Sequence, residues 1–179
     1  KVLFLGGPSQ NRAEDIITLR QDITTAQPLT VVLRTNNPAI TKFSKEFQYN
    51  PTKVESVVDE ATSSVSEMNE TSSGVFVTEP GQDPMQQIIN LAKNPNGRSK
   101  LIITNNPQRK VQYENALAGT DVRVVSPKEA QGDEASEVYM DLDRSGQDVN
   151  GGAIANEYVF NTMVATSASR AVDKLIVAR

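Results

Sequence analysis

Residues 122–142, with the sequence VRVVSPKEAQGDEASEVYMDL, decide the fold that we predict for this chain. A β-branched run at the start of the segment predicts a strand, which ends at the Ser126-Pro127 pair. An apolar run at residues 138–142 predicts a second strand, and the polar residues 131–134 lie between the two. The segment therefore predicts two buried strands joined by a short polar loop. Such a loop can present polar groups to a ligand, or it can be only a connection.

Outside this segment, short apolar strands alternate with helices. Strands are predicted at residues 1–5, 29–33, 75–77, 100–104 and 175–177, and helices at residues 38–49, 84–94, 107–117 and 156–170. A proline stands at the start of the helices that begin at Pro38, Pro84 and Pro107, where its missing N–H costs nothing. The alternation predicts an α/β fold with a mainly parallel sheet and helices on both faces.

Ligands of such sheets bind where strands end, so the polar residues that follow strands are candidate site residues. These residues are Gln10, Arg34, the Asn105-Asn106 pair and the group at residues 131–134. The Asn105-Asn106-Pro107 step is also a typical start of a helix, with asparagine as the N-cap. We expect the N-cap role there and keep a nucleic-acid contact as the alternative.

Composition excludes several classes of active site. The 179 residues contain no histidine and no cysteine, which excludes the usual zinc sites, Ser-His-Asp triads and Cys-His nucleophiles within this chain. The net charge of −4 argues against binding to nucleic acid through bulk positive charge. Without cysteine, without a signal peptide and without an apolar run of about 20 residues, the chain is expected to be cytoplasmic.

Nucleotide-binding loops of the usual kinds are absent from the sequence. Neither the Walker A pattern G-x-x-x-x-G-K-[ST] nor the dinucleotide pattern G-x-G-x-x-G occurs. The chain alone is therefore not expected to hydrolyse ATP. Its first residues, Lys1 to Leu5, already have the pattern of a buried strand, which suggests a fragment of a longer protein. Residues 50–74, rich in Ser, Thr and Glu, have the least ordered pattern.

Four segments, taken in order, resemble motifs III to VI of superfamily 1 helicases of the UvrD/Rep type. VLFLGGPSQ resembles motif III and LRTNNPAITKF resembles motif IV, with Gln10 and Arg34 at the matching positions. SPKEAQGDEASEVYMDL resembles motif V, with matches at Gln131, Gly132 and Glu134. NTMVATSASRAVDKLIVA resembles motif VI, in which a Thr-Arg-Ala step precedes the last strand; Arg170 is the matching arginine.

The resemblance implies a RecA-like second motor domain at residues 28–179, preceded at residues 1–27 by the end of the first motor domain or a connecting segment. In such helicases ATP and Mg²⁺ lie between two RecA-like domains and are bound mainly by the first, which this chain lacks. The implied partners are that domain and single-stranded nucleic acid, DNA rather than RNA.

The resemblance also implies roles for single residues. Arg34 and Arg170 would stabilise charge on the transferring phosphoryl group, and Gln10 would sense the terminal phosphate. Glu134 and Gly132 would approach the nucleotide, with Glu134 near its ribose. The residues implied for the nucleic-acid backbone are Ser126, Lys128 and Gln131.

The sequence departs from the family at two positions and leaves alternatives open. Gly7 replaces the usual aspartate of motif III, and Ser169 the usual threonine of motif VI. Arg170 could be a surface arginine favoured by a helix dipole, Arg34 could pair with a surface carboxylate, and Gln10 and Glu134 could be solvated loop residues. The alternative function is a non-catalytic RecA-like module that binds nucleic acid or protein. A small-molecule enzyme on a flavodoxin-like sheet is less attractive without histidine.

Overall fold

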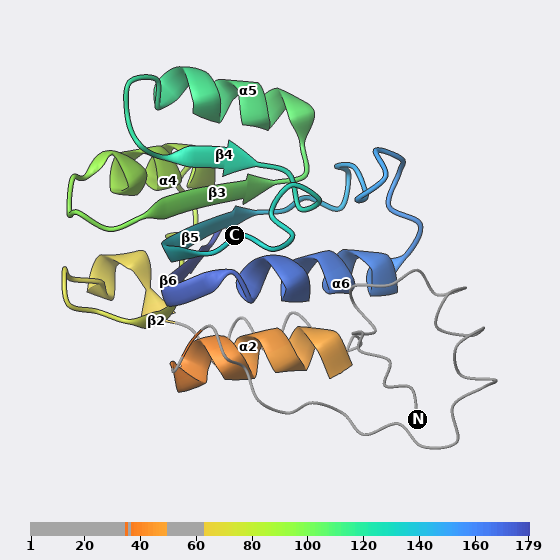
Figure 1. Ribbon diagram of the computed structural model, residues 1–179, viewed down its shortest axis with the longest axis horizontal. Helices are drawn as coiled ribbons and strands as arrows, with labels where there is room; N and C mark the ends of the chain where they lie inside the picture. Colours follow the sequence, from red (N-terminus) through yellow and green to blue (C-terminus); the bar gives the residue numbers. More distant parts are fainter. Residues whose placement is uncertain (1–34, 36, 50–62) are drawn as a thin grey trace, which may run out of the picture.

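The computed structural model describes residues 35, 37–49 and 63–179. Within them, six strands form one sheet in the order β1-β2-β6-β5-β3-β4, and every neighbouring pair is parallel (Figure 1). The strands are β1 (Ser63–Ser64), β2 (Gly74–Val77), β3 (Lys100–Thr104), β4 (Arg123–Val125), β5 (Ala135–Asp141) and β6 (Ala171–Val177). The helices are α2 (Pro38–Tyr49), α4 (Pro84–Lys93), α5 (Pro107–Ala116) and α6 (Glu157–Ala168), with a 3-10 turn at Val65–Glu67.

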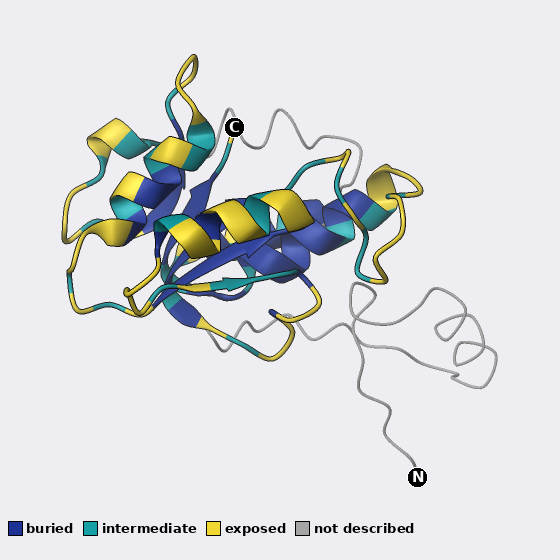
Figure 2. Ribbon diagram, turned by 90° about the horizontal axis from the view of Figure 1, so that it is seen from above, coloured by how far each residue is buried: buried dark blue, intermediate teal, exposed yellow. Residues whose placement is uncertain are grey.

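The sheet separates two apolar layers. Alternate residues of the central strands face opposite ways: Leu101 and Ile103 pack with the side chains of α2 and α6, whereas Ile102 packs with those of α4 and α5. All five residues of β3 are buried, as expected for a parallel strand covered on both faces. Figure 2, viewed from the side of α5, shows the exposed outer side of this helix in front of the buried strands. The predicted α/β fold, a parallel sheet with helices on both faces as in RecA-like domains, is confirmed.

Helix boundaries follow local chemistry. Asp83 accepts a hydrogen bond from the Met85 backbone N–H at the start of α4, and Asn106 accepts bonds from the Gln108 and Arg109 backbone N–H groups at the start of α5. The predicted N-cap role of Asn106 is thus confirmed. The predicted helix at 38–49 has the bounds of α2. None of the helices in the described part of the chain is long and apolar enough to cross a membrane.

Four strands differ from the prediction. Strand β1 was not predicted: it lies, with the 3-10 turn that follows it, in the segment at residues 50–74 that had the least ordered pattern. β5 begins at Ala135 and β6 at Ala171, earlier than the apolar runs suggested, because each strand contains a buried charged residue, Glu137 and Lys174 respectively. β4 was predicted to be buried and is partly exposed, because it is an edge strand that pairs only with β3. The predicted strands at 1–5 and 29–33, the boundary near residue 27 and residues 50–62 lie outside the described residues.

Helix α2 runs in the same direction as the strands. Its entry is held by Thr35, whose hydroxyl donates to the Val172 carbonyl at the amino end of β6 (2.6 Å). The helix packs beside α6, where the Ser44 hydroxyl donates to the Ala165 carbonyl (3.2 Å) (Figure 1). Because α6 ends where β6 begins, α2 starts at the amino edge of the sheet. We call this edge, where the strands begin, the amino edge, and the opposite one the carboxyl edge.

Candidate functional site

Two segments that resemble helicase motifs meet at the amino edge. The Ala135 backbone N–H, which ends the motif V-like loop, donates to the carbonyl of Arg170 in the motif VI-like segment (3.1 Å). Asp133 in that loop lies within electrostatic range of Arg170, and the Arg123 guanidinium, with a smaller effect from Arg170, holds the pKa of Asp133 below its usual value. The structure thus brings residues about 35 positions apart to one place.

The start of the motif IV-like segment reaches the same edge. Thr35 is buried and contacts Val172, two residues after Arg170. Its side-chain oxygen also accepts the Asn37 backbone N–H, and Asn37 in turn caps α2 through Ala39 and Ile40. Arg34, which precedes Thr35, lies outside the described residues, as does Gln10.

Arg170 is buried and is not exposed to solvent. Its side chain is only 2% exposed, and its Nε donates to the Thr166 carbonyl (3.0 Å). The same carbonyl accepts the hydroxyl of Ser169 (2.7 Å). The alternative that Arg170 is a surface arginine is therefore wrong. Its role as an arginine that stabilises phosphoryl transfer stays a prediction.

The motif V-like loop presents an exposed tip. Gln131, Gly132 and Glu134 are exposed, and Gly132 has a φ of +83°, a conformation that suits glycine. The loop is anchored through an ion pair between Arg123 of β4 and Asp133. We expected residues 131–134 among the groups that follow strands. They instead precede β5 at the amino edge, because the loop crosses back from the end of β4.

Ser126 and Lys128 lie away from that tip, just after the carboxyl end of β4. Ser126 forms a capping box with Glu129: its Oγ accepts the Glu129 N–H (3.2 Å), and Glu129 Oε2 accepts the Ser126 N–H (2.6 Å). Lys110 also contacts Glu129, and these contacts lower the pKa of Glu129 to about 2. Lys128 is exposed. The structure therefore does not group Ser126 and Lys128 with Glu134.

At the carboxyl edge, the crevice between β3 and β5 is filled by the chain itself. The two strands lead into helices on opposite faces, which makes this crevice the usual ligand position in such sheets. Here the buried Asn105 amide donates to the Asp143 and Gln147 carbonyls (2.7 and 3.2 Å) and accepts the Asp143 N–H (2.8 Å). A Cβ on Gly146 would lie 2.5 Å from the Asn105 amide nitrogen. These hydrogen bonds from Asn105 hold loop 143–147 over the crevice.

Beside the filled crevice lies a charged cluster that sequence reasoning missed. Arg109 of α5 pairs with Asp141 (2.8 Å) and Asp143 (3.4 Å), and the Tyr113 hydroxyl donates to Asp141 (2.8 Å). Burial and the neighbouring Asp141 raise the pKa of Tyr113. A pocket of about 330 Å³ opens here, lined by Asp83, Pro84, Met85, Arg109, Gln112 and Asp141. The available signal was Asp141 itself, a carboxylate at the end of an apolar strand.

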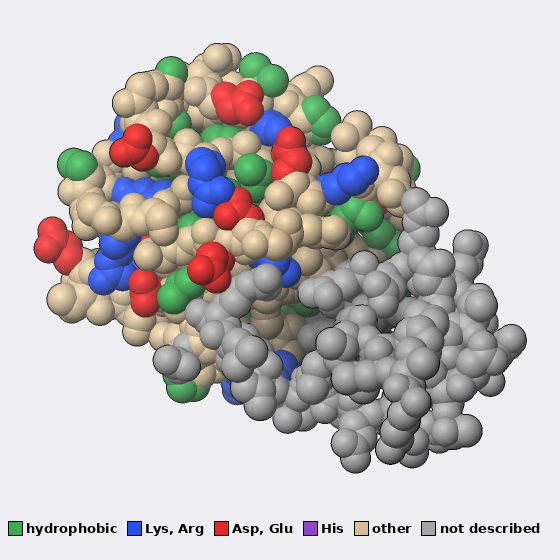
Figure 3. All heavy atoms as spheres, viewed as in Figure 1, with side chains coloured by type: hydrophobic (Ala, Val, Ile, Leu, Met, Phe, Trp, Pro, Cys, Tyr) green, Lys and Arg blue, Asp and Glu red, His purple; other side chains and the backbone are tan. Residues whose placement is uncertain are grey.

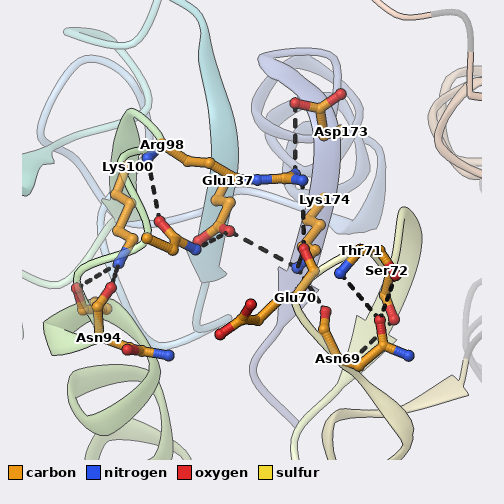
Figure 4. A network of polar contacts seen from close by, with 12 residues as sticks. Asn69, Glu70, Thr71, Ser72, Asn94, Arg98, Lys100, Glu137, Asp173 and Lys174 are labelled. Carbon is orange, nitrogen blue, oxygen red and sulfur yellow. Dashed lines mark hydrogen bonds and ion pairs between the residues drawn. The ribbon is translucent and has the colours of Figure 1, made fainter.

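A second buried network joins three strands near the amino edge (Figure 4). Lys100, Glu137 and Lys174 are paired in register on β3, β5 and β6, and all three are buried. Glu137 lies 3.8 Å from the Lys174 ammonium and accepts bonds from Asn96 (2.8 Å) and from the Tyr139 hydroxyl (2.9 Å).

The two lysines of this network hold backbone carbonyls. Lys100 binds those of Ala92 and Asn94 at the end of α4, and Lys174 binds those of Asn69 and Glu70. We therefore assign the network a structural role.

The face of the molecule in Figure 3 has no continuous positively charged patch over the described residues. On the face in Figure 3, acidic and basic side chains are interspersed over the residues that the structure describes. Within the same residues, no group of three or more acidic side chains could hold a metal ion.

No protein-family model and no curated protein matches the sequence. Among solved structures, the chain is similar to the C-terminal domain of a possible DNA helicase from Lactobacillus plantarum WCFS1, with 17% identity over 82% of this chain and 86% of that one, and a TM-score of 0.48. A likeness at this level assigns no function.

Proposed function

We propose that this chain is the second RecA-like domain of an ATP-dependent helicase or translocase of superfamily 1. In this proposal it contributes arginine and loop residues to ATP and Mg²⁺ that are bound mainly by a first RecA-like domain. It also contacts single-stranded nucleic acid, DNA rather than RNA. The domain alone is inactive, because it lacks the phosphate-binding loop.

One observation carries the proposal: three motif-like segments converge at the amino edge. Thr35 bonds to Val172, the Ala135 N–H bonds to the Arg170 carbonyl, and Asp133 lies near the Arg170 side chain. Residues that act together on one nucleotide must lie together, although the chain separates them. If the resemblance of these segments to the motifs were accidental, nothing would require them to lie together in the folded chain.

The exposed loop tip has the chemistry that the proposal needs. Glu134 offers carboxylate oxygens that can accept the hydroxyl groups of a ribose, and Gln131 offers an amide that can donate to a phosphate oxygen. Gly132 lets a ligand approach the backbone closely. Arg170 supplies the guanidinium for charge that builds during phosphoryl transfer, and in this proposal a rearrangement at the end of α6 turns it toward the nucleotide.

A second candidate function is a non-catalytic RecA-like module that binds nucleic acid or a protein. The burial of Arg170 favours it, because a 2% exposed guanidinium bonded to Thr166 already has a structural task. In that case Arg170 would fix the end of α6 and the motif V-like loop would be a contact surface.

Exposed residues test the proposal better than Arg170, whose removal would also disturb the core. In the full-length protein, Glu134→Ala should raise the KM for ATP, and Gln131→Ala should reduce stimulation of the ATPase by single strands. Glu114→Ala is the matched control, since Glu114 is exposed on α5, on the other face of the sheet. Unchanged kinetics in both loop variants would favour the binding module.

A further inference from the structure

The pocket at the carboxyl edge is the feature from which we draw a further inference. Its volume of about 330 Å³ falls at the lower end of the range for small-ligand sites. It opens between the first turns of α4 and α5, next to the carboxyl end of β5. Ligands of parallel sheets bind at this edge, and here the crevice itself is filled by loop 143–147.

The guanidinium of Arg109 is held in a fixed orientation at this pocket. Asp141 accepts from Nη1 at 2.8 Å, and Asp143 lies 3.4 Å from Nη2. Asp141 is itself fixed by the Tyr113 hydroxyl. Since hydrogen bonds to a guanidinium lie in its plane, these contacts engage the edge of the group, and a ring that stacks on Arg109 would use a flat face.

The charges of the lining disfavour a phosphate. Two carboxylates, Asp83 and Asp141, line the pocket together with only one cation, Arg109. A phosphate would meet both carboxylates at close range. A neutral flat ring would not, and it could stack on the guanidinium face, as bases do in single-strand binding proteins.

The remaining lining residues match the edge of such a ring. Asp83 uses Oδ1 to cap α4 through the Met85 N–H, and its carboxylate has further acceptor capacity. Gln112 is exposed and offers both an amide donor and a carbonyl acceptor. Met85 and Pro84 add apolar wall. An acceptor-only carboxylate selects rings that carry an exocyclic amino group.

We propose that this pocket binds one base of a single-stranded nucleic acid, with preference for bases that bear an exocyclic amino group. The ring stacks on Arg109, its amino group donates to Asp83, and Gln112 contacts a neighbouring ring atom. The choice of a nucleic-acid base over another flat ring rests on the proposed function. The pocket lies at the edge of the sheet opposite to the loop tip with Glu134, so it is a separate contact.

The experiment measures binding of the chain to fluorescein-labelled oligo(dA) and oligo(dT) of about ten nucleotides by fluorescence anisotropy. We expect tighter binding of oligo(dA), because thymine has no exocyclic amino group. Gln112→Ala should weaken binding of oligo(dA) about fivefold, the lower end of the range for loss of side-chain hydrogen bonds to the edge of a base. Gln108→Ala is the matched control: Gln108 is exposed on the same helix and does not line the pocket.

Asp83→Asn separates base recognition from the structural role of Asp83 as the cap of α4. Asparagine caps a helix as well as aspartate does, so α4 should persist, whereas the preference for oligo(dA) over oligo(dT) should shrink. Arg109→Lys should weaken both oligonucleotides, because lysine offers no flat face. Thermal melting of each variant checks that the fold is kept.

Several results would overturn the pocket assignment. These are equal binding of oligo(dA) and oligo(dT), equal effects of Gln112→Ala and Gln108→Ala, and no binding of either oligonucleotide. An ATPase of the full-length protein that responds to single strands, with pocket variants that bind normally, would reject the pocket and keep the proposed function. A full-length protein that hydrolyses no ATP, together with the predicted preference for oligo(dA), would reject the proposed function and keep the pocket.

Discussion

Removal of the Glu137 charge should destabilise the fold strongly, because it leaves two lysines buried without their shared carboxylate. Glu137→Gln keeps the shape of the side chain and removes only its charge. The Lys174 ammonium lies 3.8 Å from the carboxylate, and both side chains are nearly fully buried. At an effective dielectric constant of about 20, that one interaction amounts to about 4 kcal/mol before desolvation is subtracted.

The stability losses measured when buried ion pairs are broken in other proteins are of the same size. Breaking a buried ion pair by removing one partner costs about 3 to 5 kcal/mol, which is a large share of a typical folding free energy of about 5 to 15 kcal/mol. We therefore expect Glu137→Gln to lower the free energy of unfolding by about 3 kcal/mol or more at neutral pH. Urea unfolding followed by circular dichroism measures it, with exposed Glu114→Gln as the control.

The effect should depend on pH with a defined sign. Burial lowers the pKa of Lys100, and the Glu137 carboxylate opposes that shift. Loss of the carboxylate lowers this pKa further. Between the lowered pKa and the value in the unfolded chain, the folded chain binds fewer protons, so stability rises with pH in that window. The deficit of Glu137→Gln should therefore shrink toward about pH 10. A deficit below about 1 kcal/mol at neutral pH, or one that grows with pH, would refute the reasoning.

Two further predictions concern the carboxyl side of the sheet. Gly146→Ala should destabilise the chain by about 1 to 3 kcal/mol, because the new Cβ would lie 2.5 Å from the Asn105 amide nitrogen. Gly152→Ala is the control, since the nearest atom to a Cβ there is 3.6 Å away. Equal melting temperatures of the two variants would contradict the prediction. Glu129→Gln should cost less than about 1 kcal/mol, because Glu129 is half exposed, and the cost should fade as the pH drops from about 5 toward 2, where the wild-type carboxylate becomes protonated. A cost that is constant across that range in urea unfolding curves would count against the ion pair with Lys110.

The sequence predicted those elements whose boundaries depend on local chemistry. The Asp83-Pro84 and Asn106-Pro107 steps start helices because each combines an N-cap side chain with a proline at the first helical position. The run at residues 100–104 is a strand covered on both faces, as predicted.

Features that depend on distant partners were harder to predict. The early starts of β5 and β6 were missed because Glu137 and Lys174 are polar in sequence and become compatible with burial only when they meet across the sheet. The direction of α2 depends on the contact between Thr35 and Val172, which no local pattern encodes.

The candidate site shows the same limit. The exposure of Gln131, Gly132 and Glu134 fits their predicted loop, and only the family resemblance implied that Arg170 acts on the same nucleotide as Glu134. The burial of Arg170 was not predicted, because arginine is rarely buried and its bond to Thr166 forms only at the end of the folded helix. The pocket beside Arg109 was missed because its lining comes from α4, α5 and β5.

The most direct test of the central claim is the ATPase activity of the full-length protein, measured with and without single-stranded DNA and RNA, beside this chain alone. We predict that single strands stimulate the ATPase activity of the full-length protein, that DNA stimulates it more than RNA does, and that the chain alone hydrolyses no ATP. A full-length protein that hydrolyses no ATP with any nucleic acid would contradict the account and would favour the non-catalytic binding module.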